Sequence, residues 1–149
     1  MKNLFTAPVL LLAACSLCLA DGTLTQTRVD RGAIVQDTFT WVCTSSNSMS
    51  KISTLEVRGE ILRVVFNPAT ATPPLIAYTV TLKDQSGLDI LAGQGTGLST
   101  GTATSTKPAI KFTEGSITNI ASCVVDELLT VGVSSCGTNV SGTIVVYWK

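Results

Sequence analysis

Apolar and polar residues alternate with a period of two along much of the chain after residue 20. The clearest case is 76–83, where four large apolar residues alternate with small or polar ones. This period is typical of a strand with one face buried in a sheet. No window keeps the 3.6-residue apolar period of an amphipathic helix, so the sequence predicts little helix.

Turn signals separate the predicted strands at intervals of roughly 8–12 residues. The strands are expected at 23–29, 33–44, 52–66, 76–83, 88–92, 109–113, 121–125, 128–134 and 142–147. The segment 52–66 is expected to be one bent strand, or two strands joined at Arg58-Gly59. The turn 84–87 is expected to join 76–83 and 88–92 in a hairpin. This pattern predicts an all-β fold, an antiparallel β-sandwich of jelly-roll or Ig-like type.

Residues 93–108 are rich in glycine, serine and threonine and contain almost no large apolar residue. A stretch of this composition has little to pack against a core. We therefore expect a mobile surface loop.

The first 20 residues have the features of a secretory leader. Lys2 provides a short positive start, an apolar stretch is centred on 9–14, and residues 17–20 end in a small residue suited to cleavage. The pattern predicts a signal segment at 1–20 and a single domain at 21–149.

Residues 12–15, Leu-Ala-Ala-Cys, also resemble the lipobox of bacterial lipoproteins, in which Cys15 would carry a lipid. Only in that case do we expect contact with a membrane. A third interpretation is an apolar arm that stays on the protein and packs against a neighbour.

The composition excludes several classes of function. Hydrophobic residues make up 45% of the 149 and charged residues 13%, which argues against disorder. Ten basic and ten acidic residues give a net charge of zero, so nucleic acid is not an expected partner. The chain has no histidine, the commonest general base and metal ligand.

Three cysteines, Cys43, Cys123 and Cys136, belong to the predicted domain. Export would favour one disulfide. Cys123 and Cys136 flank a predicted strand and could close a short loop, whereas Cys43 with Cys123 across two sheets is the alternative. Three free, partly buried thiols are a further alternative. No CxxC pair occurs in the domain, so we expect no zinc or other metal site.

No set of residues has the pattern of a catalytic site. Neighbouring carboxylates occur as Glu56/Glu60, Asp84/Asp89 and Asp126/Glu127. Exposed strand and turn positions explain these pairs as well as catalysis does. Serine nucleophiles lack a histidine partner, and the glycine-rich residues 93–97 lack the lysine of a phosphate loop. We expect no enzyme activity and no cofactor.

Candidate interface residues lie at both ends of the predicted domain. Trp148 and Tyr147 alternate in a last strand whose two faces are both apolar, which predicts cover on both sides. Leu24 and Val29 lie in the first strand, whose edge is a candidate for pairing with another chain. We expect a closed homo-oligomer, with a trimer as one possibility.

Three segments of the chain are similar to segments of known proteins. They are 78–95 (YTVTLKDQSGLDILAGQG), 129–148 (LTVGVSSCGTNVSGTIVVYW) and 25–29 (TQTRV). They resemble a group of small tailed-bacteriophage proteins encoded among virion genes. The resemblance implies a non-enzymatic β-sandwich on the virion, a capsid-decorating, neck or tail component that binds itself and other virion proteins.

The leader and the cysteines depart from that pattern, because phage virions assemble in the cytoplasm. The alternative is an exported or lipid-anchored surface binding protein, bacterial or prophage-encoded. Its location would be the periplasm, the outer membrane or the cell surface.

Overall fold

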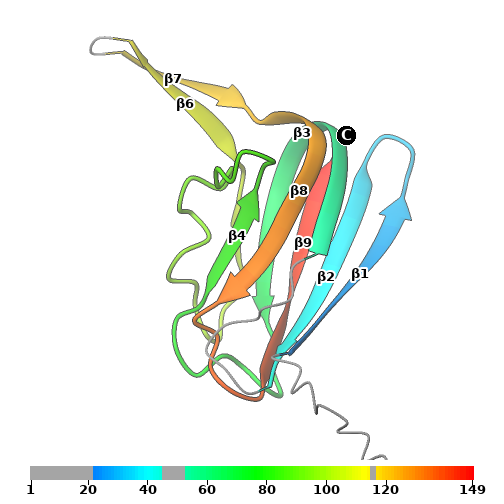
Figure 1. The fold of residues 1–149 in the computed structure, drawn as a ribbon, viewed down its shortest axis with the longest axis vertical. Coiled ribbons are helices and arrows are strands. Elements are labelled where there is room, and N and C mark those ends of the chain that lie inside the picture. Colours follow the sequence, from blue (N-terminus) through cyan, green and yellow to red (C-terminus); the bar gives the residue numbers. More distant parts are fainter. Residues whose placement is uncertain (1–21, 45–52, 115–116) are drawn as a thin grey trace, which may run out of the picture.

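The computed structural model describes residues 22–44, 53–114 and 117–149. Within them every regular element is a strand (Figure 1). The strands are β1 (Gly22–Asp30), β2 (Val35–Cys43), β3 (Ser53–Pro68), β4 (Thr79–Lys83), β5 (Thr104–Thr106), β6 (Ala109–Glu114), β7 (Ile117–Ser122), β8 (Val124–Ser134) and β9 (Val140–Trp148). The predicted all-β class is confirmed. The expected leader, with Cys15, lies outside the described residues.

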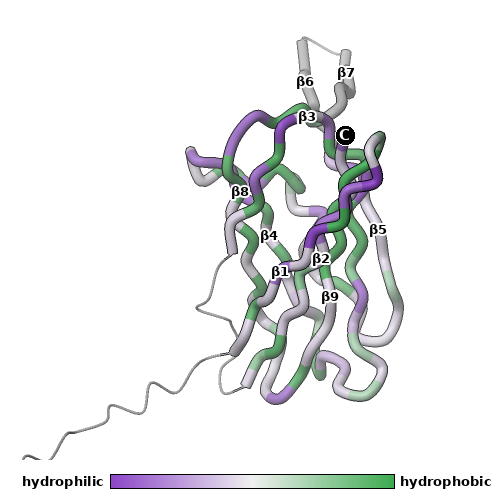
Figure 2. The backbone as a smooth tube through the Cα atoms, turned by 90° about the vertical axis from the view of Figure 1, so that its right-hand side faces the viewer, coloured by the Kyte–Doolittle hydropathy of each residue, from purple (hydrophilic) through white to green (hydrophobic). Residues whose placement is uncertain are grey.

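Seven strands form one antiparallel hydrogen-bonded path that folds back on itself. The order is β1-β2-β9-β3-β8-β4, with β5 beside β3. Residues 53–60 of β3 pair with β8, and residues 61–68 pair with β9. β3 therefore passes from one layer to the other. We call these the β8 layer (residues 53–60 of β3, β8 and β4) and the β9 layer (β1, β2, β9, residues 61–68 of β3, and β5). Figure 2 shows the two layers from the side.

Gly59 permits the bend in β3. A Cβ at this position would lie 1.9 Å from the carbonyl oxygen of Lys149, too close for any side chain. Glu60 and Lys149 exchange two backbone hydrogen bonds beside it, and the register with β9 shifts between Ile61 and Arg63. The bend expected at Arg58-Gly59 is thus found, within one continuous strand.

The core lies between the two layers and follows the predicted alternation. Trp41 and Tyr78 are fully buried, with ring centroids 5.3 Å apart. Gly142 leaves room for the indole, because a Cβ there would lie 2.6 Å from a ring carbon of Trp41. The other large, fully buried side chains are Phe39, Phe66, Leu55, Ile61, Leu82, Leu91, Leu129, Ile144, Val57 and Val64.

The expected strand at 88–92 is absent, so the predicted hairpin has only one strand. The turn 84–87 forms, but beyond a single bridge between Lys83 and Asp89 the chain continues as turns. Asp89 causes this, because its carboxylate accepts hydrogen bonds from the backbone N–H groups of Leu82, Leu91 and Gly93. These local bonds hold residues 89–93 in turns and replace a strand ladder.

The loop expected at 93–108 lies largely at the surface, as predicted, but parts of it are bonded to the sheet. The N–H of Val80 donates to the carbonyl of Gly95, and the N–H of Leu98 donates to that of Tyr78, so this segment covers the outer edge of β4. Leu98 is 6% exposed, and β5 pairs with β3 further along. Backbone bonds and one buried leucine anchor a stretch whose composition predicted none.

Two further strand predictions differ from the structure. Residues 121–125 and 128–134 were expected as separate strands, but β8 is continuous from Val124 and the preceding residues belong to β7. β7 pairs with β6 in a two-stranded sheet that projects from one end of the sandwich (Figure 1).

Candidate functional site

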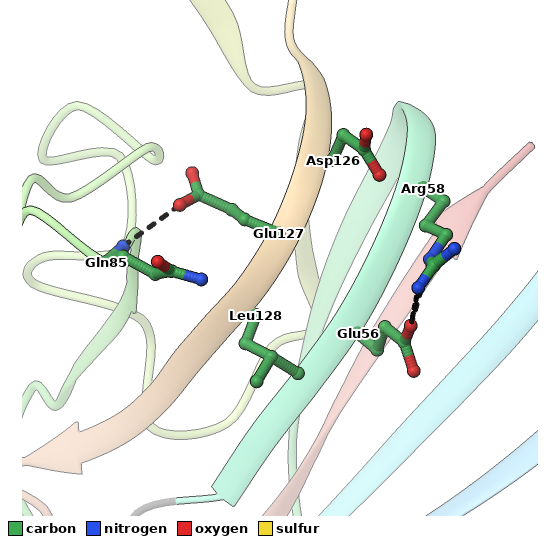
Figure 3. A pocket seen from close by; sticks show the side chains of 6 residues that line it. All are labelled: Glu56, Arg58, Gln85, Asp126, Glu127 and Leu128. Carbon is green, nitrogen blue, oxygen red and sulfur yellow. Dashed lines mark hydrogen bonds and ion pairs between the residues drawn. The ribbon is translucent and has the colours of Figure 1, made fainter.

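A shallow hollow of about 300 Å³ lies on the β8 layer, between β3, β8 and the turn after β4. Its lining consists of Glu56, Arg58, Gln85, Asp126, Glu127 and Leu128. The register places Glu56 opposite Leu128 and Arg58 opposite Asp126. Figure 3 shows Glu127 reaching toward Gln85, while Arg58 and Glu56 lie across β8 from them. Strand pairing therefore joins residues about 70 positions apart in the sequence.

The hollow is acidic, and most of its polar groups already have partners. Arg58 pairs with Glu56 at 2.9 Å, and these side chains are 74% and 51% exposed. Glu127 accepts a hydrogen bond from the backbone N–H of Gln85 at 3.3 Å. Three carboxylates against one guanidinium leave a charge of −2 around Leu128. A surface of this kind attracts a basic group beside an apolar one.

Two apolar side chains of β8 face solvent on this layer. Leu128 is 47% exposed and Val124 is 68% exposed. Asp126 lies between them on the same face of the strand, since side chains alternate along it. An apolar side chain within a charged rim is the usual anatomy of a protein-binding patch.

The predicted interface residues divide between the two faces of the β9 layer. Leu24 and Trp148 pack partly against the core. Val29, 44% exposed, and Tyr147, half-buried, face outward, both beside Gln36 in the register. The structure therefore does not bring the four residues together. Their role in an interface stays a prediction.

Trp148 belongs to a cluster around a buried carboxylate. Asp37 is 0% exposed, and its oxygens accept hydrogen bonds at 2.9 Å from Trp148 Nε1, Arg28 Nε and Gln26 Nε2. The Arg28 guanidinium also lies 5.4 Å from the Trp148 ring centroid. Arg28 Nη2 then donates to the carbonyl oxygen of Glu56 in the facing layer. This cluster connects β1, β2, β9 and β3, which is a structural role.

The disulfide joins Cys43 to Cys136, so neither expected pairing is correct. Cys123 is a free thiol, 4% exposed. Cys123 cannot pair with Cys136, because the eleven residues of β8 separate the two cysteines by about 35 Å. Cys43 ends β2 beside Val140, at the same end of the sandwich as Cys136. Burial raises the pKa of the Cys123 thiol, and the nearby Glu127 adds to the effect.

The other carboxylates singled out in the sequence have structural partners. Glu60 forms ion pairs with Lys107 and Lys149, each at 3.3 Å, away from the Glu56–Arg58 pair. Asp84 accepts hydrogen bonds from the Ser86 hydroxyl and from backbone N–H groups of its turn, and these bonds lower its pKa. Among the described residues no three His, Cys, Asp or Glu side chains are placed to hold a metal ion.

Tyr78 has no bonding partner for its hydroxyl within the described core, and burial raises its pKa to about 12. In the part of the chain that the structure describes, no helix is long and apolar enough to cross a membrane.

Sequence reasoning found Glu56, Asp126 and Glu127 only as neighbouring acids and missed the hollow. The other residues that line the hollow, Arg58, Gln85 and Leu128, have no feature in the sequence that marks them as part of a site. Comparison with family models, curated proteins and solved structures finds no match.

Proposed function

We propose that this chain is a non-enzymatic structural protein that acts outside the reducing cytoplasm through contacts with other proteins. The observation that carries the proposal is the exposed β8 face, where Leu128 lies among the acidic side chains of the hollow and Val124 is exposed further along the same strand. Apolar side chains held on a rigid strand supply binding energy, and the surrounding charges select the partner. We expect the partner to present a basic side chain next to an apolar one.

The first candidate role is a component of a tailed-phage virion, on the capsid, neck or tail. It is supported by the resemblance of residues 78–95 and 129–148 to such proteins. In the structure residues 78–95 form β4 with the turns that cover its edge, and residues 129–148 form the C-terminal part of β8, the loop after it and β9. Both segments belong to the strands and turns that build the sandwich, which is compatible with a structural role.

The second candidate role is an exported surface binding protein, with which the Cys43–Cys136 disulfide is compatible. Disulfides persist at cell surfaces and in the periplasm, and also on released virions. The disulfide therefore supports an oxidising location in either role.

The mass of the native protein, measured from purified particles and from the cell envelope, separates the two roles. An intact N-terminus in virions supports the first. A start at Asp21, or a diacylglycerol on Cys15, in the envelope fraction supports the second. A protein found only in the soluble cytoplasm contradicts both.

Leu128→Asp tests the binding surface. We expect the variant to fold with an unchanged melting temperature, because Leu128 is 47% exposed, and to be lost from the particle or envelope fraction. Thr40→Asp, on the exposed outer face of the β9 layer, is the matched control and should be retained. Equal retention of both variants would remove the β8 face from the proposal.

A further inference from the structure

The outer face of the β9 layer carries a basic side chain beside an aromatic one. Arg63 and Tyr147 are partners in the register of β3 and β9, so their side chains are neighbours on the same face. Arg63 is exposed, and within the described residues its guanidinium forms no ion pair or hydrogen bond. Gln36 and Val29 continue the line across β2 and β1, and Val29 is 44% exposed. We call these four residues the basic row.

The basic row lies at the end of the β9 layer where β1 turns into β2. Gln36 is the second residue of β2, and Cys43, the partner of Gly22, is at the other end of the strand, about 24 Å away. The chain before Gly22 and after Thr44 therefore joins the sheet at the end far from the basic row. All four residues of the row belong to paired strands, so they lose little conformational entropy on binding.

The hollow near Leu128 lies on the opposite outer face of the sandwich. Three carboxylates and one guanidinium give its lining a charge of −2, and Leu128 is 47% exposed. The β8 and β9 layers pack against each other through the core, so the hollow and the basic row face in opposite directions (Figure 2). One molecule thus presents an acidic surface with an apolar side chain on one side, and a basic surface with an aromatic side chain on the other.

These two surfaces are complementary in charge and in apolar content. Arg58 lies opposite Asp126 in the register but pairs with Glu56, which leaves Asp126 without an ion pair among the described residues. An incoming guanidinium binds a carboxylate through two parallel hydrogen bonds. A ring beside that guanidinium would cover Leu128 and bury apolar area. Arg63 with Tyr147 is therefore the combination that the hollow is expected to select.

The arrangement requires two molecules. Because the hollow and the basic row lie on opposite faces, a copy cannot bring its own Arg63 to its own Asp126. A second copy in the same orientation, placed over the first, brings the two surfaces together. Such a contact is heterologous, since each copy uses a different surface, and it continues as a filament or closes as a ring.

We propose that the basic row of one copy binds the hollow of the next, so that copies stack head to tail. Arg63 then faces the carboxylates of Asp126 and Glu127, and Tyr147 packs on Leu128. The inference rests on the proposed function, because it names a second copy of this chain as the partner of the hollow.

Sedimentation velocity of the purified, disulfide-bonded protein tests the proposal. We expect the wild type to form oligomers at micromolar concentration, and about 0.5 M NaCl to dissociate them by screening the ion pairs. Arg63→Glu and Leu128→Asp should each lower the association constant at least about ten-fold without changing the melting temperature, because both side chains are exposed. Thr40→Asp is the matched control. It places a carboxylate further along the same outer face as Arg63 and should associate as the wild type does.

A mixture of the two variants separates head-to-tail stacking from a two-fold contact. Arg63→Glu retains an intact hollow, and Leu128→Asp retains an intact basic row. Equimolar mixing should therefore restore one contact and give a one-to-one dimer that grows no further. Dimerisation of either variant alone at the wild-type concentration, or a mixture that stays monomeric, overturns the proposal.

The inference and the proposed function can fail separately. A wild type that is monomeric up to millimolar concentration overturns the stacking. If Leu128→Asp is nevertheless lost from the particle or envelope fraction, the proposed function stands, and the partner of the hollow is a different protein. If the wild type stacks as expected but Leu128→Asp is retained in that fraction, the stacking stands and the proposed function loses its binding surface.

Discussion

Asp37 places a carboxylate inside the sandwich, at a position where its strand otherwise presents Phe39 and Trp41 to the core. Its cost of burial is offset by three donors, two of which belong to Arg28 and Trp148. The alternation in residues 33–44 puts Asp37 on the buried face, so its burial was predictable. Its partners were not, because Trp148 lies 111 residues away in sequence.

Replacing Asp37 with alanine should destabilise the domain by about 2–4 kcal/mol, because it leaves Trp148 Nε1, Arg28 Nε and Gln26 Nε2 without their acceptor. Thermal or urea unfolding measures this change. Glu56→Ala is the control, since it breaks an exposed ion pair and should cost less than about 1 kcal/mol. An equal loss of unfolding free energy in the two variants would show that the buried Asp37 cluster stabilises the domain no more than an exposed ion pair does.

The Cys123 thiol should be unreactive in the folded protein. It is 4% exposed, and both its burial and the charge of Glu127 raise its pKa from 9.0, so the nucleophilic thiolate is scarce at neutral pH. We expect alkylation by iodoacetamide at pH 8 to be at least about ten-fold slower than in urea. Mass spectrometry of the tryptic peptides, read at Cys123 only, provides the measurement. Rapid modification of native protein would mean that the junction of β7 and β8 opens readily.

At the scale of elements, the sequence predicted strands better than it predicted what joins them. β1, β2, β3 and β9 agree with their predicted ranges to within a few residues. The strand predicted at 88–92 was wrong because the Asp89 side chain binds backbone N–H groups that a strand ladder would use. The alternation of apolar and polar residues gives no sign of such bonds. The hollow could not be predicted, because it depends on the pairing of β3 with β8.

The disulfide should be a major source of stability, since it connects residues 93 positions apart. Closing a loop of this length restricts the unfolded chain, and losing the bond typically costs about 2–5 kcal/mol. We expect Cys43→Ser/Cys136→Ser to lower the melting temperature, and a reducing agent to lower that of the wild type by a similar amount. The double variant itself should not respond to the reducing agent. A wild type equally stable in reduced form would contradict this prediction and would weaken the argument for an oxidising location.

At the scale of the whole molecule, β3 makes the two layers interdependent. Its first half is paired in the β8 layer and its second half in the β9 layer, and residues from both halves are fully buried in one core. Removing either layer would therefore strip pairing and packing from the other. The sequence predicted two packed sheets, but the sharing of a strand depends on the close approach of Gly59 to Lys149, which is a tertiary contact.

The position of the disulfide also determines how the domain would respond to a mechanical load. A force applied between Gly22 and Lys149 can stretch only the chain outside the Cys43–Cys136 link, because that covalent bond bypasses the residues between them. The maximum extension is then about 120 Å, against about 440 Å for the same chain in reduced form. Single-molecule pulling in the presence and absence of a reducing agent should show the two lengths. A component that holds an assembly together under strain would thus lengthen by a fixed, short distance and keep most of its chain protected from extension.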